Sequence, residues 1–428
     1  MARSLRSSAK PWIVVATIAT ATLMAVTTTW VYERIRDVYP VDWAVYRYGS
    51  AAAWGGVDLY AANLHGEHLV AEGLPFTYTP FAALVLWPTN LGNQQVGLWA
   101  WNIASMLVLL AVLAMVTPAD ARRRAIAVFL SGAAAAATIM ATAHFEFGQI
   151  NLFLMFLVIA DLWRRPPGTD TTIARWLPRG VLIGIAAAIK LTPGLFIVYL
   201  AVAKQWRMFW WCVAGFVGAF VAAFVVRPAL TIAFFTHGLW RLSDKVALGS
   251  KFATSGNNSI QGVLAAVGGW TKPLALVLTA LATVAGLLLA RRAAHRCGLL
   301  AGGVIVGMTA TLISPISWEH HWVYLFAAAM FIWFRRGWWA RLVVLGGAAL
   351  TIFCTPENGD RLITAASSGL AALGWLLREM LMLLAIVAIA IIAYGKRRPS
   401  RLGGATDQAR IDRLVDEAAF DTADRVRR

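Results

Sequence analysis

Apolar runs recur along almost the whole chain, and several approach the roughly 20 residues that a helix needs to cross a bilayer. Hydrophobic residues make up 59% of the 428 residues and charged residues only 14%. A soluble globule of this composition would expose more apolar surface than water tolerates. None of the runs alternates polar and apolar residues as the strands of a membrane barrel do. The sequence therefore predicts an all-α polytopic membrane protein with about 12 transmembrane helices.

The basic residues set the orientation of the predicted helices. The net charge is +17, but lysines and arginines gather in short runs between apolar segments, at residues 122–124, 291–296, 335–336 and 396–398. This pattern is typical of cytoplasmic loops under the positive-inside rule and gives no basic face for nucleic acid. We read residues 11–31 as a retained first span and expect both termini in the cytoplasm. Residues 1–395 form the predicted membrane domain, and residues 396–428 form a cytoplasmic tail.

Prolines and glycines predict where the helices break. The segment at 78–87 is too short to span comfortably and is broken by Pro80 and Pro88, so we expect a re-entrant or tilted half-helix there. Two short helices are expected to meet at residues 190–193, because Lys190 and Pro193 lie in the middle of an apolar run. A further break is expected at 268–273. Whole crossings are predicted at 97–116, 125–143, 151–163, 208–226, 299–313, 323–334, 342–353 and 370–394, with an outer turn at 355–361.

Two polar segments are expected on the outer face. The first, residues 32–75, holds six of the 21 acidic residues: Glu33, Asp37, Asp42, Asp58, Glu67 and Glu72. The second, residues 227–258, is net positive. A pump would place ionisable groups near the bilayer midplane, where Lys190 is the one plausible candidate. The distribution therefore favours a catalytic site at the outer face.

Two aspartates are candidates for a general base. A hydroxyl is a weak nucleophile until a positioned carboxylate takes its proton. Asp58 follows Gly55 and Gly56, whose flexible backbone lets the carboxylate approach a ligand. We prefer it for that reason and keep Asp42 as the alternative. Either aspartate can equally well cap a helix or a turn.

A second group of candidates can face an anion. Glu319, His320 and His321 follow the predicted span at 299–313. Neighbouring histidines point about 100° apart on a helix and make a poor metal motif, so we predict no metal. A histidine can donate a hydrogen bond to an anionic group and adds positive charge if protonated. Further candidates for binding the anion are the cations Lys190, Arg241, Lys245 and Lys251, although such cations are often merely solvated. The candidates for binding the rest of the substrate by hydrogen bonds are Glu319 and the amides Asn257 and Asn258.

Several segments resemble one family when they are read in order. They are residues 42–46 (DWAVY), 58–60 (DLY), 76–81 (FTYTPF), 148–151 (GQIN), 190–193 (KLTP) and 314–322 (SPISWEHHW). In this combination they are similar to the polyprenol-phosphate-mannose-dependent mannosyltransferases of bacteria, which have the GT-C fold. The resemblance covers nearly the whole membrane part and leaves out the tail.

The resemblance implies an inverting transfer of mannose at the periplasmic face of the plasma membrane. The expected donor is polyprenyl-phosphate-mannose, used without a further cofactor, and the expected acceptor is a phosphatidylinositol mannoside that gains an α-1,2-linked fifth mannose. An aspartate of the first outer loop is the implied base. A related acceptor, lipomannan or lipoarabinomannan, remains an alternative, and in another class a lipid-linked sugar transporter. Aromatic faces for sugar stacking come from Trp43, Tyr46, Tyr48 and Tyr60, unless these residues are interface anchors.

Overall fold

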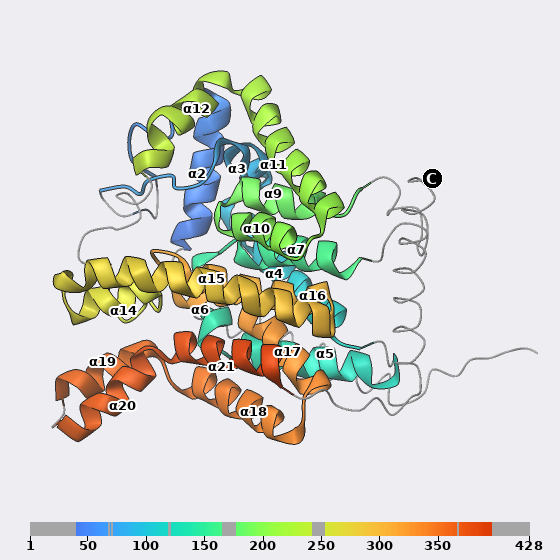
Figure 1. The fold of residues 1–428 in the computed structure, drawn as a ribbon. Helices are drawn as coiled ribbons and strands as arrows, with labels where there is room; N and C mark the ends of the chain where they lie inside the picture. The colour runs from blue at the N-terminus through green and yellow to red at the C-terminus, as the bar shows by residue number, and fades with distance from the viewer. Residues whose placement is uncertain are drawn as a thin grey trace, which may run out of the picture.

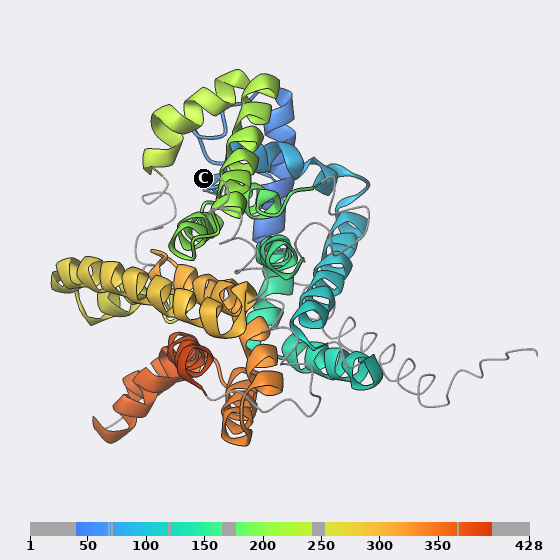
Figure 2. The same cartoon turned by 45° about the vertical axis from the view of Figure 1, so that its right-hand side comes forward.

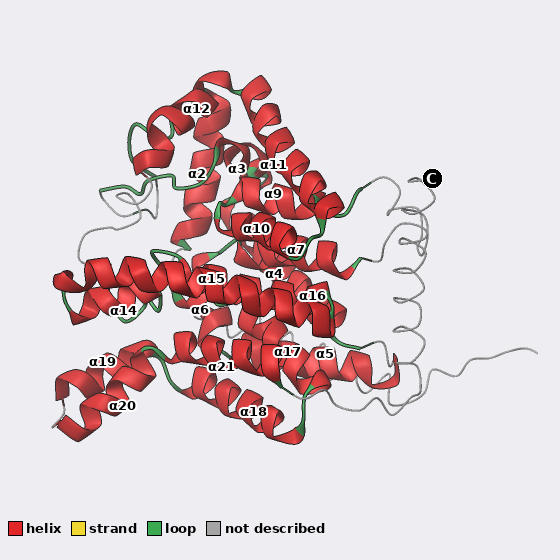
Figure 3. Ribbon diagram, in the orientation of Figure 1, coloured by secondary structure: helices red, strands yellow, loops and turns green. Residues whose placement is uncertain are grey.

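The computed structural model describes residues 40–66, 69, 72–118, 121–164, 177–241, 253–365 and 368–395 (Figure 1). This part of the chain is built from helices and contains no strand longer than the isolated bridge between Leu64 and Leu74 (Figure 3). The all-helical prediction is confirmed for these residues. The first span predicted at 11–31 and the tail at 396–428 lie outside them.

A pair of antiparallel helices runs through the middle of the molecule. It consists of α15 (Lys272–Cys297) and α16 (Leu299–Ile313), joined at Gly298. Figures 1 and 2 both place α2 (Val41–Gly55), α11 (Trp206–Val226) and α12 (Pro228–Ala233) on one side of this pair. On the other side lie α18 (Trp338–Phe353), α19 (Pro356–Ala365), α20 (Ser368–Arg378) and α21 (Met380–Tyr394).

Helix α16 is the centre of the packing, with twelve of its fifteen residues buried. Small residues on it let neighbours approach closely, as is common between membrane helices. A Cβ at Gly302 would lie 2.2 Å from the Tyr199 hydroxyl, and a Cβ at Gly307 would lie 2.2 Å from the Tyr324 ring. Tyr324 begins α17 (Tyr324–Arg335), and Tyr199 lies in α10 (Leu195–Val202). The glycines of α16 therefore hold its neighbours around the centre.

Three helices in the described ranges are long and apolar enough to cross a membrane: α4 (Gln94–Val116), α11, and the segment Gly269–Cys297 that contains α15. Up to six spans result if each of three sharply bent helix pairs counts as one. The chain is thus a polytopic membrane protein. The total of about twelve spans and the GT-C fold remain predictions.

The predicted breaks are confirmed. A short α3 (Pro80–Val85) and a 3₁₀ turn at Trp87–Asn90 occupy the segment predicted as a half-helix. Helix α9 (Val181–Ile189) ends before Lys190, and α10 follows a 3₁₀ turn at Thr192–Gly194. Helix α14 (Ile260–Val267) is separated from α15 by Gly268 and a 3₁₀ turn. In each case a proline or glycine interrupts the helix where its backbone cannot continue it.

Other predicted boundaries were wrong, because the chain bends sharply within two segments that were each predicted as one crossing. The crossing predicted at 125–143 is two helices, α5 (Ala121–Ala136) and α6 (Ile139–Phe147), bent by 72°. The segment predicted at 370–394 is α20 and α21, bent by 69°. The outer turn predicted at 355–361 is helical and belongs to α19.

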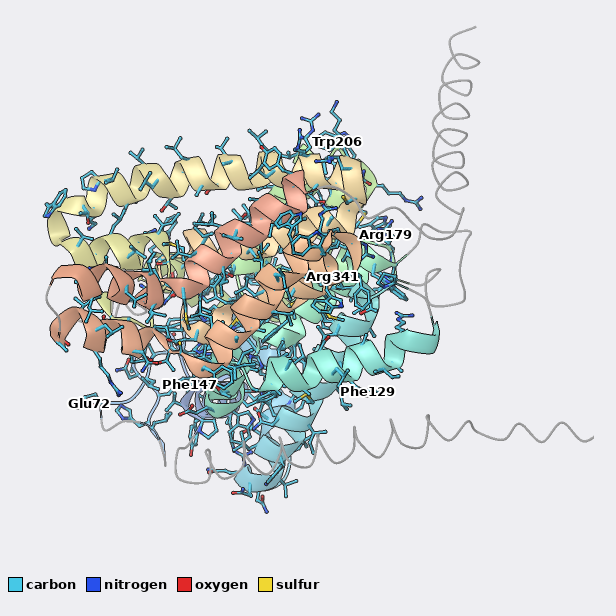
Figure 4. All side chains as sticks on the ribbon, turned by 90° about the horizontal axis from the view of Figure 1, so that it is seen from below. Glu72, Phe129, Phe147, Arg179, Trp206 and Arg341 are labelled. Atoms are coloured by element: carbon cyan, nitrogen blue, oxygen red, sulfur yellow. The ribbon has the colours of Figure 1, made fainter. Side chains whose placement is uncertain are left out.

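The polar segment at 32–75 is not simply a loop. Its central part forms α2, whose residues Trp43, Ala44 and Tyr46 are fully buried. Figure 4 shows Glu72, which lies after this helix, and Phe147 toward one end of the molecule. Arg179 and Arg341 lie toward the other end, as does Trp206. Glu72 and these two arginines therefore lie toward opposite ends of the molecule.

Candidate active site

A cavity of about 1280 Å³ opens where α2, α7 (Asn151–Trp163), the break after α9, α16 and the 3₁₀ turn Glu319–His321 meet. One wall is polar and is lined by Asp42, Thr77, Thr79, Gln149, Asn151, Lys190, Thr192, His320 and His321. An adjoining wall is apolar and is formed by Leu154, Met155, Phe196, Val323 and Tyr324. The cavity is also lined by Ser255, Gln261, Lys272, Glu319 and Glu357. The cavity can thus take a ligand that has both a polar head and an apolar chain.

Asp42 lies in the first turn of α2, which begins after Pro40. The helix dipole stabilises a carboxylate at this position. Burial nevertheless raises the pKa of Asp42 to about 6, and the charge of Lys190 and a hydrogen bond from Gln149 offset part of that rise. A carboxylate with this pKa is ionised at neutral pH and is basic enough to accept a proton.

Lys190 lies at the break between α9 and the following 3₁₀ turn. Its backbone is extended, with φ −137° and ψ 133°. Its ammonium donates a hydrogen bond of 3.0 Å to Asn151 Oδ1 and lies 5.5 Å from the centre of the Tyr78 ring. Thr79 secures the break by donating its hydroxyl hydrogen to the carbonyl of Ala188. The broken helix therefore places one positive charge on the polar wall.

A left-handed glycine turns the chain between α6 and α7. Gly148 has φ +65°, and a Cβ there would lie 2.5 Å from Trp43 Cβ, so any other residue is strained. The turn leads to Gln149 and Asn151. Gln149 Oε1 accepts hydrogen bonds from Tyr46 at 3.3 Å and from Asn151 at 3.2 Å. Two amides from one short turn are thereby fixed beside Lys190.

The turn Glu319–His321 brings two imidazoles together. The rings of His320 and His321 meet edge to face with their centres 4.6 Å apart. Both ring nitrogens of His320 are buried without a hydrogen-bond partner among the described residues. Burial lowers the pKa of both histidines well below its usual value, so both are neutral in the free protein. They offer hydrogen bonds to a ligand, and the positive charge on this wall comes from Lys190.

His144 is a third imidazole near this turn that the sequence analysis did not single out. It lies in α6, which packs against the turn Glu319–His321, and its ring is fully buried. Its two ring nitrogens also have no partner in the described part of the chain. Its place behind the cavity wall, rather than in it, gives it no direct contact with a ligand.

Glu319, a predicted substrate-binding residue, lines the cavity. Burial raises its pKa to about 8, and the nearby Glu357 and Glu146 add to the rise. It is therefore largely protonated at neutral pH. A carboxylic acid in this state can both donate and accept a hydrogen bond.

Asp58 does not line the cavity. Its Oδ1 accepts a hydrogen bond of 2.9 Å from the Tyr60 backbone, and its Oδ2 lies 3.5 Å from His237 Nε2. The side chain is 42% exposed. Its local bond to the Tyr60 backbone closes a turn, which is the structural role that Asp residues commonly have after glycines. The geometry therefore favours the alternative, Asp42, as the base.

Three of the predicted sugar-stacking aromatics are part of the core. Trp43, Tyr46 and Tyr60 are no more than 1% exposed, which corrects the expectation that their faces are open to a sugar. Tyr60 donates its hydroxyl hydrogen to the carbonyl of Tyr78, at 2.9 Å. Tyr48 is partly buried, accepts a hydrogen bond from Gln94, and does not line the cavity. These rings therefore stabilise the fold by packing and do not present a face on which a sugar can stack.

The two asparagines predicted to bind substrate also have structural roles. Asn257 Oδ1 accepts a hydrogen bond of 2.9 Å from the backbone of Ser317, and Asn258 Nδ2 donates one of 2.7 Å to Ser255. Both residues are fully buried outside the cavity lining. This prediction is therefore corrected: they fasten the start of α14 to the segment before the histidines. Arg241 ends a 3₁₀ turn at Leu239–Arg241, and its side chain is outside the described set, as are Lys245 and Lys251.

Several lining residues were not predicted as site residues. Gln149 and Asn151 belong to a segment that carried the family resemblance, but nothing in the local pattern gave them a role. Two amides at the start of an apolar helix were the available signal, because such groups need partners. Among the described residues, no group of three His, Cys, Asp or Glu side chains is placed to hold a metal ion.

The cavity, its carboxylate beside a lysine and its adjoining apolar wall fit an enzyme that moves a polar group from a lipid carrier. A family model described as Glycosyltransferase family 87 matches residues 76–315, more than half of the chain. The chain belongs to this family and is a glycosyltransferase.

Individual relatives carry more specific names. The chain is 30% identical over 358 residues to a "Polyprenol-phosphate-mannose-dependent alpha-(1-2)-phosphatidylinositol mannoside mannosyltransferase" of Mycolicibacterium smegmatis, covering 76% of this chain and 78% of the relative. The counterpart of that name from Mycobacterium tuberculosis is 29% identical, with 73% and 75% covered. A "phosphatidylinositol pentamannoside mannosyltransferase" of M. tuberculosis is 31% identical, with 76% and 74% covered. No solved structure matches the chain.

Proposed function

We propose that this protein is an inverting α-1,2-mannosyltransferase that moves mannose from polyprenyl-phosphate-mannose to a phosphatidylinositol mannoside. The observation that carries the proposal is the half-buried carboxylate of Asp42, which lines one cavity together with Lys190, His320 and His321. A base and groups that stabilise an anion are the two requirements for displacing a phosphate with a hydroxyl. The names of the relatives supply the sugar, the carrier and the acceptor class.

The proposed reaction is a single displacement. The acceptor hydroxyl gives its proton to Asp42 while its oxygen bonds to the anomeric carbon. The bond from that carbon to the phosphate oxygen breaks on the opposite face, and its electron pair leaves with the polyprenyl phosphate. The phosphate gains one negative charge, which Lys190 and the two histidines are placed to stabilise. A β-linked donor then gives an α-linked product.

The apolar wall is suited to the carrier's chain. Leu154 and Met155 of α7, Phe196 of α10 and Tyr324 of α17 line it. Burying the first isoprene units there stabilises the bound donor by about 25 cal/mol for each Å² of apolar surface removed from water. That energy holds the reacting phosphate in place on the polar wall.

We further propose that the cavity opens at the periplasmic face of the plasma membrane, with both termini in the cytoplasm. Two arginines support this orientation, because Arg179 and Arg341 lie at the end of the molecule opposite Glu72 (Figure 4) and positive charge gathers on the cytoplasmic side of membrane proteins. The membrane domain over residues 1–395 and the tail over 396–428 are part of the same proposal.

For the acceptor, we propose the step that adds the fifth mannose. Identities of 29–31% to relatives of both names do not separate this step from addition to a pentamannoside. An assay that offers acceptors with four and five mannoses at equal concentration separates them, and lipomannan tests the remaining acceptor. Preferred extension of the four-mannose lipid supports the proposal, and preferred extension of another acceptor contradicts it.

The experiment that tests the proposed activity uses purified protein in detergent with radiolabelled polyprenyl-phosphate-mannose and these acceptors. Detergent leaves no compartments, so a lipid-linked sugar transporter would form no product. Formation of an α-1,2-mannosidase-sensitive glycolipid supports the proposed transferase. A wild-type protein that forms no product under these conditions contradicts it.

A further inference from the structure

The lysine of the polar wall is bound to an amide and not to the nearby carboxylate. Lys190 Nζ donates a 3.0 Å hydrogen bond to Asn151 Oδ1 and lies over the Tyr78 ring. Within the described ranges Lys190 and Asp42 form no ion pair, although the charge of each acts on the other across the cavity. A flexible lysine side chain is thus kept near an aspartate but out of direct contact with it.

The side chain of Asn151, which accepts the hydrogen bond from Lys190, is held firmly in place. Asn151 is the first residue of α7, and its side chain is almost fully buried. Its Nδ2 donates to Gln149 Oε1 at 3.2 Å and to the carbonyl of His320 at 3.2 Å. Rotation of this amide would break three hydrogen bonds at once. One side chain therefore connects the lysine, the amide beside the base and the histidine turn.

We propose that Asn151 is a positioning residue that holds the Lys190 ammonium away from Asp42, so that the carboxylate stays free to take the acceptor's proton. The inference rests on the proposed function, in which Asp42 is the base. Nothing in the relatives' names assigns Asn151 a role.

The physical reason is that a direct ion pair weakens a base. An opposite charge in contact lowers the pKa of a carboxylate by about 1 to 3 units, and a less basic carboxylate is a poorer proton acceptor. A buried ammonium that loses its hydrogen-bond acceptor seeks another anionic or polar partner. Across this cavity wall, that partner is Asp42.

Other ionisable groups face Asp42 and Lys190, and the substitutions at Asn151 leave all of these groups in place. Tyr46 of α2 and Tyr78 of the loop before α3 face Asp42, and both remain neutral phenols at neutral pH. Lys190 is faced by three imidazoles, His144 of α6 and His320 and His321 of the 3₁₀ turn. Asn151 is uncharged, so replacing it with Ala changes no formal charge.

The first measurement is an infrared titration of the purified protein without substrates. The carboxylic-acid band of Asp42 is identified as the one that Asp42→Asn removes. Asn151→Ala is expected to move its midpoint to lower pH by about 1 unit, because the released Lys190 pairs with Asp42. Lys190→Met is expected to move it to higher pH, and Asn151→Ala is expected to add nothing in the Lys190→Met protein.

The second measurement is the pH dependence of kcat/KM for mannosyl transfer. Asn151→Ala is expected to lower the plateau about tenfold and to move the acid limb to lower pH, since the paired carboxylate is less basic. Asn151→Asp keeps the size of the side chain but binds Lys190 as an ion pair. The positive charge that acts on Asp42 is then reduced, so the acid limb is expected to move to higher pH. Asn63→Ala, an exposed asparagine away from the cavity, is the matched control and should move neither limb nor plateau.

Opposite shifts for the two Asn151 variants support the inference. The inference would be overturned if both variants moved the acid limb in the same direction or left it unmoved. It would also be overturned if Asn151→Ala had the same effect with and without Lys190. A purely structural role for Asn151 predicts those results. If the wild-type protein transfers no mannose, the proposed function fails, and the infrared titration still decides whether Asn151 keeps Lys190 from Asp42.

Discussion

The substitution Asp42→Asn tests the proposed base directly. Asparagine has nearly the same size as aspartate and can still form hydrogen bonds in the cavity, but it cannot take up a proton. Because the pKa of Asp42 is about 6, roughly thirty carboxylates are present for each carboxylic acid at pH 7.5. Almost every wild-type molecule is therefore ready to act as a base at that pH, and every variant molecule has lost this ability.

The size of the loss follows from the role. General-base catalysis contributes about 10²- to 10⁴-fold to the rate, so kcat should fall by that factor. This corresponds to a rise of about 3 to 5 kcal/mol in the activation free energy. Donor binding should change little, because the phosphate faces Lys190 and the histidines. The free energy of unfolding should stay within about 1 kcal/mol, since the substitution preserves shape and removes a buried charge.

The assay is single-turnover transfer from radiolabelled polyprenyl-phosphate-mannose in detergent, with donor affinity and thermal unfolding measured on the same preparations. Asp58→Asn is the matched control, because it makes the same change at a partly exposed aspartate outside the cavity. It should retain activity within about twofold of the wild type.

The reasoning is refuted if Asp42→Asn keeps more than a tenth of the wild-type rate while remaining folded. A large loss in Asp58→Asn together with activity in Asp42→Asn would give the role of base to Asp58. In that case the ligand-bound cavity would have to extend to the turn at Asp58, in contrast to the cavity described above.

Three further outcomes are expected. The value of kcat/KM should fall about tenfold per pH unit below about pH 6, because the raised pKa of Asp42 leaves the base protonated there. A pH–rate profile checks this, and the fall at acid pH should be missing from the residual activity of Asp42→Asn. Replacing His320 and His321 with Ala should lower kcat/KM for the donor by roughly 10- to 100-fold through lost hydrogen bonds to an anion, with the acceptor KM nearly unchanged; equal effects on both substrates in steady-state kinetics would remove them from the phosphate site. Gly148→Ala should destabilise the protein by about 1 to 3 kcal/mol, since it combines a left-handed backbone with a Cβ 2.5 Å from Trp43, and a thermal unfolding midpoint equal to that of the wild type would argue against this account.

The sequence was most informative where one local cause controls the structure. Prolines and glycines located the breaks at Lys190, at Gly268 and around Pro80, because a backbone that lacks a donor or adopts positive φ cannot continue a helix. It was least informative where packing decides. The bend between α5 and α6 has no such marker, and α2 arose in a segment read as a polar loop because its aromatic residues face the core.

The sequence by itself determined that the chain is a helical membrane protein, since so much apolar surface is stable only in a bilayer, and it offered two aspartates as candidates for the proposed base. What distinguishes the two aspartates is their place in the tertiary structure. Asp42 and Lys190 are far apart in the chain and line the same cavity, whereas Asp58 is held by its own turn outside that cavity. Burial, and with it the pKa of a carboxylate, depends on neighbours from distant segments, and no local pattern of residues specifies those neighbours.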